Sequence, residues 1–290
     1  MQQGVVPSRA LLTILLCTFG VFVASAAADM TPFRRLPAAL RAEAWMVAST
    51  RQGRRFFGPP AILAALVVVA FAHGRVQERK AKLQARDAFE QWFASQNRVE
   101  SSILQARNAL IVVRFVDYQC PPCRLTFMAY GPVIDRFRTL YPGRVKAVTI
   151  DFPLDSTCNA AANSTVHPLA CEAAAAVRMA RRSGRERELE KWLFSNQRDL
   201  SHARLWGAAS SLSGVEYSDG IYRSAIAEIQ QDLKTAAAFK VRTTLTYFIN
   251  GIRMEGFHPK EQFEIALEHE ARRLGLDAAG VEFTPTAVVR

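Results

Sequence analysis

The sequence predicts an α/β domain of about 190–215 residues that follows an apolar N-terminal region. Three observations predict this class. A continuous apolar run at 110–113, typical of a strand buried on both faces, leads into a CxxC turn. Alanine-rich and amphipathic helical segments fill the middle of the chain, and Asn250-Gly251 between two short apolar runs is the strongest short-range signal of a β-hairpin. The order strand, helix, strand, helical block, hairpin and helix is expected to enclose one sizeable core.

The N-terminal quarter of the chain is strongly basic. The 290 residues carry 37 Lys+Arg against 26 Asp+Glu, for a formal net charge of +11, and residues 1–75 hold eight arginines but only two acids. An excess of this kind first suggests nucleic acid as a partner. Here, however, the basic residues flank apolar segments and do not alternate with aromatic ones. The sequence therefore indicates a membrane region at 1–75 and no nucleic-acid partner.

Two segments of 19 residues, 10–28 and 56–74, contain no Asp, Glu, Lys or Arg. At about 1.5 Å rise per residue, each is long enough to cross a hydrocarbon core of about 30 Å. We therefore expect two transmembrane helices that contact the lipid bilayer. Segment 10–28 ends in small residues and also fits a cleavable signal peptide, so this alternative stays open.

The loop between the two apolar segments predicts the orientation. It contains six arginines, and short arginine-rich loops stay on the cytoplasmic side of a membrane. Everything after residue 75 is then expected outside the cytoplasm.

Cysteine usage agrees with an oxidising compartment. Four of the five cysteines follow residue 75, as the pairs Cys120/Cys123 and Cys158/Cys171. The second pair encloses a 14-residue loop, for which a disulfide contributes on the order of 3 kcal/mol by chain entropy. We expect a structural bridge there, with a second redox relay as the alternative.

The chain after residue 75 divides into a helical stalk (76–98), the α/β domain (99–275) and a tail (276–290). The elements expected within the domain are listed in chain order: a strand that begins at 110, a helix at 121–141, a strand at 145–152, helices at 168–182, 185–196, 203–212 and 218–239, a hairpin at 247–254, and a closing helix at 260–274.

Cys120-Pro121-Pro122-Cys123 is the motif that carries the chemistry. The preceding strand fixes the loop, and the following helix directs its positive end at the first sulfur, which stabilises a thiolate. Prolines suit the first helical turn, although these two remove two N–H donors that could have solvated the thiolate. Redox chemistry is the interpretation that we favour over a metal site or an inert bridge.

A zinc site needs two further ligands at a compatible spacing. The remaining candidates, Cys158, His167 and Cys171, show neither a second CxxC nor an HxxxH pattern. We expect no metal, and disulfide exchange requires no other cofactor.

At this point the residues resemble a known family. The motif FxDYxCPxC at 115–123, with VRTTLTYFING at 241–251, resembles the DsbA-type branch of the thioredoxin fold, and the helical block at about 155–239 lies where that branch carries its helical insertion. DFPLD at 151–155 and HPLAC at 167–171 are similar to the thioredoxin domains fused to bacterial vitamin K epoxide reductase homologues. The resemblance covers roughly residues 76–275.

The resemblance implies a thiol–disulfide oxidoreductase with Cys120 as nucleophile and Cys123 as resolving thiol, acting on client proteins that carry thiols or disulfides. Residues 1–75 then look like the last two membrane spans of the fusion family. The resemblance therefore implies a bacterial inner membrane, with the folded domain in the periplasm or another extracytoplasmic space. They lack the paired cysteines of a quinone-linked reductase, so a separate membrane redox partner is implied.

Three positions depart from the family pattern. Arg114 stands where the family places a buried acid; it either favours the thiolate of Cys123 from below or points to solvent at a strand end. Asp117 is the nearest alternative acid or simply a turn residue. Leu245 replaces the family's cis-proline, so we expect a trans Thr244–Leu245 bond and altered substrate handling.

Two functions of different classes follow from these residues. The first is a membrane-anchored thiol–disulfide oxidoreductase, with oxidation of client thiols as the expected direction and reduction or isomerisation as alternatives. The second is a redox-inactive thioredoxin-like binding module or metal chaperone, in which the two thiolates hold Cu(I) or Zn(II).

Overall fold

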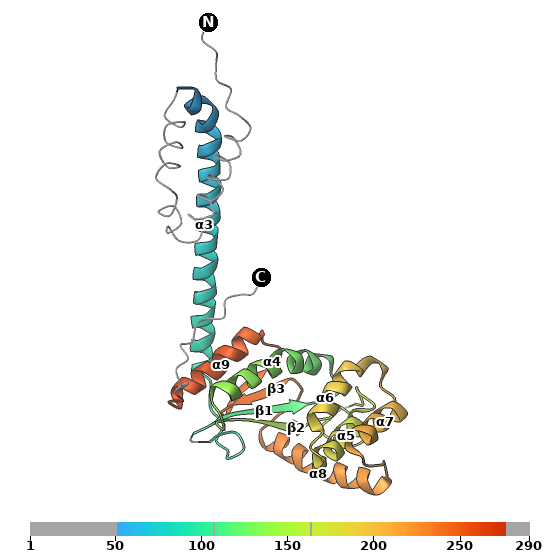
Figure 1. The fold of residues 1–290 in the computed structure, drawn as a ribbon. Helices are drawn as coiled ribbons and strands as arrows, with labels where there is room; N and C mark the ends of the chain where they lie inside the picture. Colours follow the sequence, from blue (N-terminus) through green and yellow to red (C-terminus); the bar gives the residue numbers. More distant parts are fainter. Residues whose placement is uncertain (1–50, 107, 163, 277–290) are drawn as a thin grey trace. The chain divides into compact units, whose positions relative to one another are not determined.

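The computed structural model describes residues 51–106, 108–162 and 164–276, with side chains from residue 66 onward (Figure 1). The chain divides into two compact units, Met1–Ala85 and Arg86–Arg290. In the first unit the described residues belong to helix α3 (Arg51–Ala94), which also supplies the first residues of the second unit. The expected span 10–28 lies outside the described residues, and 56–74 falls within α3. No helix in the described part of the chain combines the length and the apolar character needed to cross a membrane.

The second unit contains one sheet and its helices, and their bounds are listed in chain order. They are β1 (Leu110–Val116), α4 (Pro121–Leu140), β2 (Val145–Asp151), α5 (Ala170–Arg182), α6 (Glu186–Ser195), the short 3₁₀ helix η2 (Gln197–Asp199), α7 (His202–Ser213), α8 (Asp219–Ala238), β3 (Thr246–Ile249), β4 (Ile252–Glu255) and α9 (Lys260–Arg273).

The four strands form one sheet in the order β2-β1-β3-β4. Strands β1 and β2 are parallel, whereas β3 is antiparallel to both β1 and β4. Helices α4 and α9 cover one face together with the end of α3, and α8 packs on the opposite face (Figure 1). Strand β1 is therefore buried on both sides, as its unbroken apolar run at 110–113 predicts.

The Asn250-Gly251 pair makes the expected hairpin between β3 and β4. Asn250 has φ +44° and Gly251 has φ +86°, the positive values that a tight two-residue hairpin loop requires. A Cβ at Gly251 would lie 2.6 Å from the carbonyl oxygen of Val99, so glycine is needed there for space as well as for conformation.

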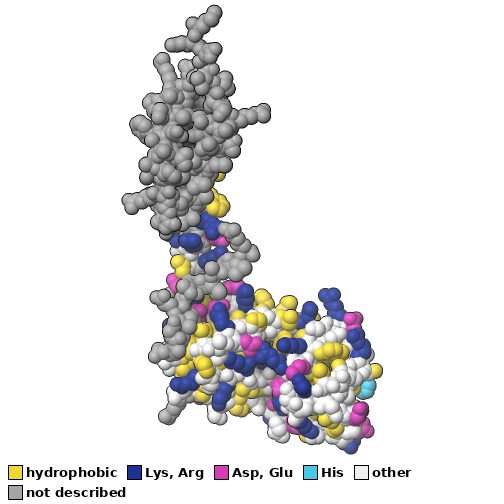
Figure 2. All heavy atoms as spheres, in the orientation of Figure 1, with side chains coloured by type: hydrophobic (Ala, Val, Ile, Leu, Met, Phe, Trp, Pro, Cys, Tyr) yellow, Lys and Arg dark blue, Asp and Glu magenta, His cyan; other side chains and the backbone are white. Residues whose placement is uncertain are grey.

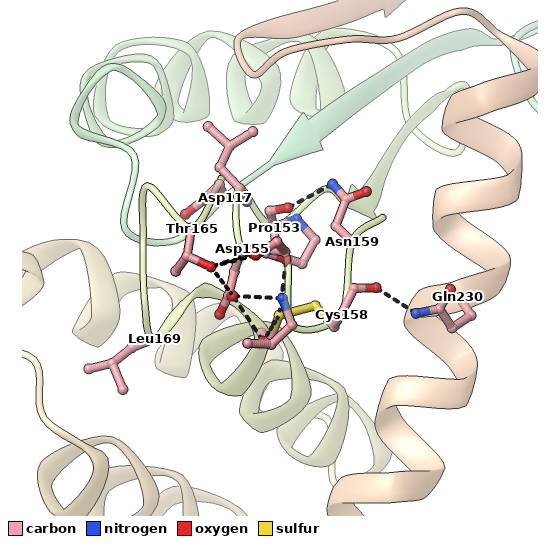
Figure 3. The surroundings of a disulfide bond; sticks show 12 residues. Asp117, Pro153, Asp155, Cys158, Asn159, Thr165, Leu169 and Gln230 are labelled. Carbon is pink, nitrogen blue, oxygen red and sulfur yellow. Dashed lines mark hydrogen bonds between the residues drawn. A yellow bond between two sulfur atoms is a disulfide. The ribbon is translucent and has the colours of Figure 1, made fainter. Parts of the chain in front are cut away.

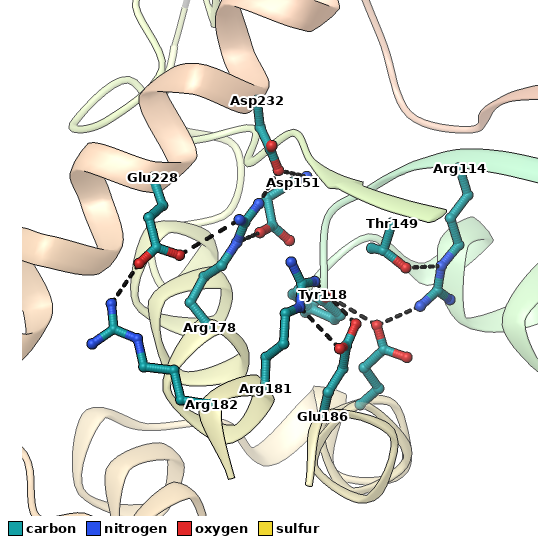
Figure 4. Close-up of polar contacts among 11 residues, drawn as sticks. Arg114, Tyr118, Thr149, Asp151, Arg178, Arg181, Arg182, Glu186, Glu228 and Asp232 are labelled. Atoms are coloured by element: carbon teal, nitrogen blue, oxygen red, sulfur yellow. Dashed lines mark hydrogen bonds and ion pairs between the residues drawn. The ribbon is translucent and has the colours of Figure 1, made fainter. Parts of the chain in front are cut away.

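The helical insertion α5–α8 is tied to the sheet by buried ion pairs (Figure 4). Arg178 on α5 donates from Nε to Asp151 Oδ2 at the end of β2, at 2.6 Å, and also pairs with Asp232 on α8. Burial raises the pKa of Asp151 to about 6, although Arg178 opposes this effect. The pairing holds the insertion against the carboxyl end of the parallel strands.

Basic residues of the second unit are distributed among acidic and apolar ones. On the face shown in Figure 2, Lys and Arg side chains lie between acidic side chains and apolar patches. Several are partners in ion pairs, such as Arg136 with Glu264 and Arg187 with Asp135.

The predicted α/β class and the thioredoxin-like fold are confirmed. A parallel β1–α4–β2 unit and an antiparallel β3–β4–α9 unit share one sheet, and the helical insertion lies between them in the chain. Each expected strand and helix of the domain is present, with ends shifted by a few residues at most.

Candidate active site

The two cysteines of the CxxC motif lie at the start of α4. Cys120 caps the helix in an extended conformation, Pro121 and Pro122 occupy its first turn, and Cys123 follows on the buried side. Both thiols are free, and the two residues are 5% and 4% exposed. The strand and helix that the sequence predicts thus bring both sulfurs to one point at the edge of the core.

The environment of Cys120 favours its thiolate. The hydrogen bond from the Cys123 thiol lowers the pKa of Cys120 to about 6, and the Thr244 hydroxyl and the Cys123 backbone N–H add to this effect. Thr244 Oγ1 lies 3.3 Å from Cys120 Sγ. Burial and the negative charge of Asp117 act in the opposite direction. The Cys123 thiol, the Thr244 hydroxyl and the Cys123 backbone N–H therefore stabilise the thiolate in place of the two N–H donors that Pro121 and Pro122 lack.

The second thiol has the opposite character. Cys123 keeps its proton in the hydrogen bond to Cys120, and this bond together with burial raises the pKa of Cys123 well above its ordinary value. One thiol is therefore poised as a thiolate near neutral pH and its neighbour stays protonated. A CxxC pair divided in this way suits attack by the first sulfur followed by intramolecular closure with the second.

The loop before β3 corrects one expectation. The Thr244–Leu245 peptide bond is cis, not trans as expected for a non-proline residue. The trans form was expected because a peptide bond before a non-proline residue locally prefers it. In the structure this loop is held by contacts from elsewhere in the chain: Leu245 belongs to the same buried apolar cluster as both cysteines, and its carbonyl oxygen accepts from Gly256 N at 3.0 Å. Thr244, the residue before this bond, lies beside the reactive pair, with its hydroxyl next to Cys120 Sγ.

Arg114 takes neither of the two placements expected for it. Its guanidinium pairs with Glu190 on α6, and its Nε donates to Thr149 Oγ1 at 2.8 Å (Figure 4). Glu190 also accepts from the Tyr118 hydroxyl at 3.0 Å. The side chain is only 16% exposed, so it does not point to solvent, and its charge is matched by Glu190 and does not stand free below the cysteines. The insertion supplies this partner from 76 residues further along the chain.

Asp117 is both a turn residue and an acid of the site. Its Oδ1 accepts from Gln119 N at 2.7 Å, which shapes the turn into α4. Its Oδ2 accepts from Leu154 N at 2.7 Å and lies 2.8 Å from His167 Nδ1. The side chain has no exposed surface. A buried carboxylate therefore lies beside the CxxC even though position 114 holds an arginine.

The helical insertion also holds the CxxC loop directly. Gln197 in η2 donates from Nε2 to the carbonyl oxygens of Tyr118 at 2.9 Å and Cys120 at 3.0 Å. Leu169 N donates to Gln119 Oε1 at 2.6 Å. Neither Gln197 nor Glu190 stands in a motif, and no sequence signal marked them.

The second cysteine pair forms a disulfide between the residues that were paired by their spacing (Figure 3). The bridge joins Cys158, in the loop after β2, to Cys171 in the first turn of α5. Asp155 organises this loop from inside, since its Oδ1 accepts from Thr157 N at 3.0 Å and Thr165 Oγ1 at 3.2 Å. Across the described ranges, no group of three or more His, Cys, Asp or Glu side chains is placed to hold a metal ion.

The α/β core with a divided thiol pair at the start of α4 defines the class of protein: a thioredoxin-like fold of the kind that thiol–disulfide oxidoreductases use. No protein-family model matches the chain. Among solved structures it is similar to the catalytic domain of Proteus mirabilis ScsC, with 20% identity, a TM-score of 0.45, and coverage of 59% of this chain and 87% of that one. It is also similar to the oxidoreductase DsbA from Xylella fastidiosa, with 14% identity, a TM-score of 0.41, and coverage of 59% and 89%.

The chain also matches part of the sequence of curated proteins that are named as antiporters. Proteins named Na(+)/H(+) antiporter NhaA 1, from Mycobacterium sp. (strain KMS) and from Mycolicibacterium vanbaalenii, are each 28% identical to this chain over 152 residues. The match covers 51% of this chain but only 23% and 22% of the two relatives. The chain thus corresponds to less than a quarter of the antiporters that it resembles.

Proposed function

We propose that this protein is a thiol–disulfide oxidoreductase that oxidises thiols of client proteins through Cys120 and Cys123. The observation that carries the proposal is the geometry of the pair: both thiols are free at the start of α4, and the Thr244 hydroxyl lies 3.3 Å from Cys120 Sγ. This environment lowers the pKa of Cys120 to about 6 and raises that of Cys123. A stabilised thiolate favours the reduced form of the site, and a site with a stable reduced form is a strong oxidant of other thiols.

The proposed reaction consumes the Cys120–Cys123 disulfide. A client thiolate attacks Cys120 Sγ, the bond between the two cysteines breaks, and Cys123 leaves as a thiolate that takes up a proton. A second client thiolate then attacks the client sulfur of the mixed disulfide, and Cys120 leaves as a thiolate. The client loses two electrons and gains a disulfide, and the CxxC pair gains the two electrons as a dithiol. A separate redox partner, not identified by these residues, reoxidises the pair.

Apolar surface next to the cysteines suits an unfolded client. Leu125 and Met128 lie on the exposed side of α4, two and five residues after Cys123, and are 56% and 61% exposed. Exposed large apolar side chains beside a reactive group are typical of surfaces that bind other polypeptides.

Equilibration of the purified full-length protein in graded glutathione buffers tests the proposal. The expected result is a reversible two-electron transition of Cys120–Cys123, together with stoichiometric oxidation of a reduced dithiol peptide by the oxidised protein. Cys120→Ser is the matched control and should show neither. A CxxC pair that neither forms a disulfide nor transfers it to the peptide would contradict the proposal.

We further propose that residues 1–75 attach the protein to the inner membrane, with the oxidoreductase domain on the extracytoplasmic side. The support comes from the sequence alone: the uncharged segments 10–28 and 56–74 and the six arginines between them. The kinship with thioredoxin domains fused to vitamin K epoxide reductase homologues has the same kind of support, from the motifs at 151–155 and 167–171. A reporter fused after residue 80 that is active only in the cytosol would contradict this orientation.

A further inference from the structure

A buried negative charge lies beside the reactive sulfur. The carboxylate of Asp117 has no exposed surface, and its charge disfavours the thiolate of Cys120. At position 114, the other place for a buried acid, the side chain is an arginine already paired with Glu190. A positive charge next to Asp117 would therefore stabilise the Cys120 thiolate.

His167 is placed to supply a positive charge next to Asp117. Among the described donors to Asp117, the backbone amides of Gln119 and Leu154 are neutral, and only His167 can carry a positive charge. Its Nδ1 lies 2.8 Å from Asp117 Oδ2, and because a carboxylate only accepts hydrogen bonds, this nitrogen donates. The His167 side chain is 17% exposed, so its ring can exchange protons with solvent. The Asp117 side chain has no contact with solvent.

The disulfide-closed loop fixes the position of this histidine. His167 lies between Cys158 and Cys171, four residues before the second of them. Its backbone N–H donates to the carbonyl oxygen of Leu154 at 3.2 Å, and the N–H of the same Leu154 donates to Asp117. The loop is thus anchored to Asp117 through the histidine ring and through the backbone of residue 154. Figure 3 shows Asp117 and this loop side by side around the disulfide.

We propose that His167 is a positioning residue of the thiol site, which acts through Asp117: its imidazolium offsets the carboxylate beside Cys120, and its neutral form leaves that charge uncompensated. The proposal rests on the oxidoreductase function proposed above. In the oxidising cycle, the bond between the client sulfur and Cys120 breaks and the electron pair goes to Cys120 Sγ. The imidazolium keeps its own proton throughout and stabilises the departing thiolate by neutralising Asp117.

The charge of His167 is available near neutral pH. The hydrogen bond that His167 donates to Asp117 raises the pKa of His167, against the effect of partial burial, and the charges of Asp117 and the Cys120 thiolate raise it further. In the described part of the chain, these are the charged groups that act on the ring. As the pH rises through the raised value, the ring loses its charge, and Cys120 becomes a poorer leaving group and a less stable thiolate.

A double-mutant cycle on the reduced full-length protein tests the proposal, with the ultraviolet absorbance of the Cys120 thiolate followed against pH. His167→Gln keeps a hydrogen-bond donor but no charge, and should raise the Cys120 midpoint by about half a unit to one unit. Asp117→Asn should lower it, and in that background His167→Gln should have little further effect. His167→Lys, which restores a fixed positive charge, should return the midpoint toward the wild-type value.

His202 offers a matched control, because it forms the same kind of pair, with Nδ1 2.7 Å from Glu172 Oε2, in the insertion. His202→Gln should leave the Cys120 midpoint unchanged. An unchanged midpoint in both His167→Gln and His167→Lys, or shifts that simply add in the double variant, would overturn the proposal. The titration needs no client, so failure of the oxidoreductase function and failure of this inference give different results.

Discussion

The hydroxyl of Thr244 gives the sharpest test of how the Cys120 thiolate is stabilised. Thr244→Val keeps the shape of the side chain and removes the donor that lies 3.3 Å from Cys120 Sγ. A hydrogen bond to a charged group contributes about 1.5–3 kcal/mol, and one pKa unit corresponds to about 1.36 kcal/mol. Taking the lower end for a sulfur acceptor, we expect the pKa of Cys120 to rise from about 6 to about 7.

Thiolate absorbance of the reduced protein measures this shift directly. At pH 6, the ionised fraction of Cys120 should fall from about one half to about one tenth. Thr243→Val is the control, because its hydroxyl bonds to the Thr244 carbonyl oxygen and not to the sulfur. A Thr244→Val midpoint that stays at the wild-type value, or a Thr243→Val midpoint that moves as far, would refute the reasoning.

The same substitution has a consequence for stability. Because folding lowers the pKa of Cys120, its thiolate stabilises the reduced protein above the unfolded cysteine value of about 8.5, and this contribution is lost as the pH falls through about 6. In Thr244→Val this loss should be complete at a pH about one unit higher, near 7. Urea unfolding of the reduced protein at several pH values should therefore show a gap between wild type and Thr244→Val that opens between about pH 6 and about pH 7 and stays nearly constant above.

Two further predictions concern the framework of the site. Arg178→Leu removes the cation shared by the carboxylates of Asp151, Glu228 and Asp232, and should lower the free energy of unfolding by about 3–5 kcal/mol. Arg182→Leu, at a more exposed position on the same helix, should cost less than about 1 kcal/mol in the same urea titration. Equal losses of unfolding free energy in the two variants would contradict the stabilising role of the ion pairs around Arg178. Replacing both Cys158 and Cys171 by Ala should cost about 3 kcal/mol by thermal or urea unfolding, and a loss below about 1 kcal/mol would show that the loop is held without the bridge.

Local signals in the sequence predicted most of the fold. The apolar run of β1, the prolines after Cys120 and the Asn250-Gly251 turn each act over a few residues, and each element lies where these signals put it. The paired cysteines 158 and 171 were likewise found from spacing alone.

Contacts between distant segments account for what was missed. Glu190, the ion-pair partner of Arg114, lies 76 residues further along the chain. The residues around position 114 therefore do not predict that this arginine is buried. The cis bond before Leu245 lies in a loop buried in the same apolar cluster as the CxxC, and the sequence around Leu245 does not reveal this surrounding. The sequence presents His167 as a candidate metal ligand and as the first residue of the motif at 167–171, but its pairing with Asp117, 50 residues away, leaves no local signal.

Trapping of a mixed disulfide tests most directly the central claim that Cys120 is the cysteine that bonds to the client and Cys123 its partner within the pair. The test runs the exchange in the reverse direction, in which the reduced protein attacks a peptide disulfide through Cys120 and Cys123 resolves the mixed disulfide. Reduced Cys123→Ser and Cys120→Ser proteins are each mixed at pH 7 with a peptide that carries one internal disulfide, quenched with acid and weighed intact. Cys123→Ser should accumulate a stoichiometric peptide adduct, because its thiolate is formed and nothing resolves the bond. Cys120→Ser should react at least about ten times more slowly, because the remaining thiol is buried and protonated. Equal rates for the two variants, or a faster reaction of Cys120→Ser, would contradict the assignment of the two cysteines.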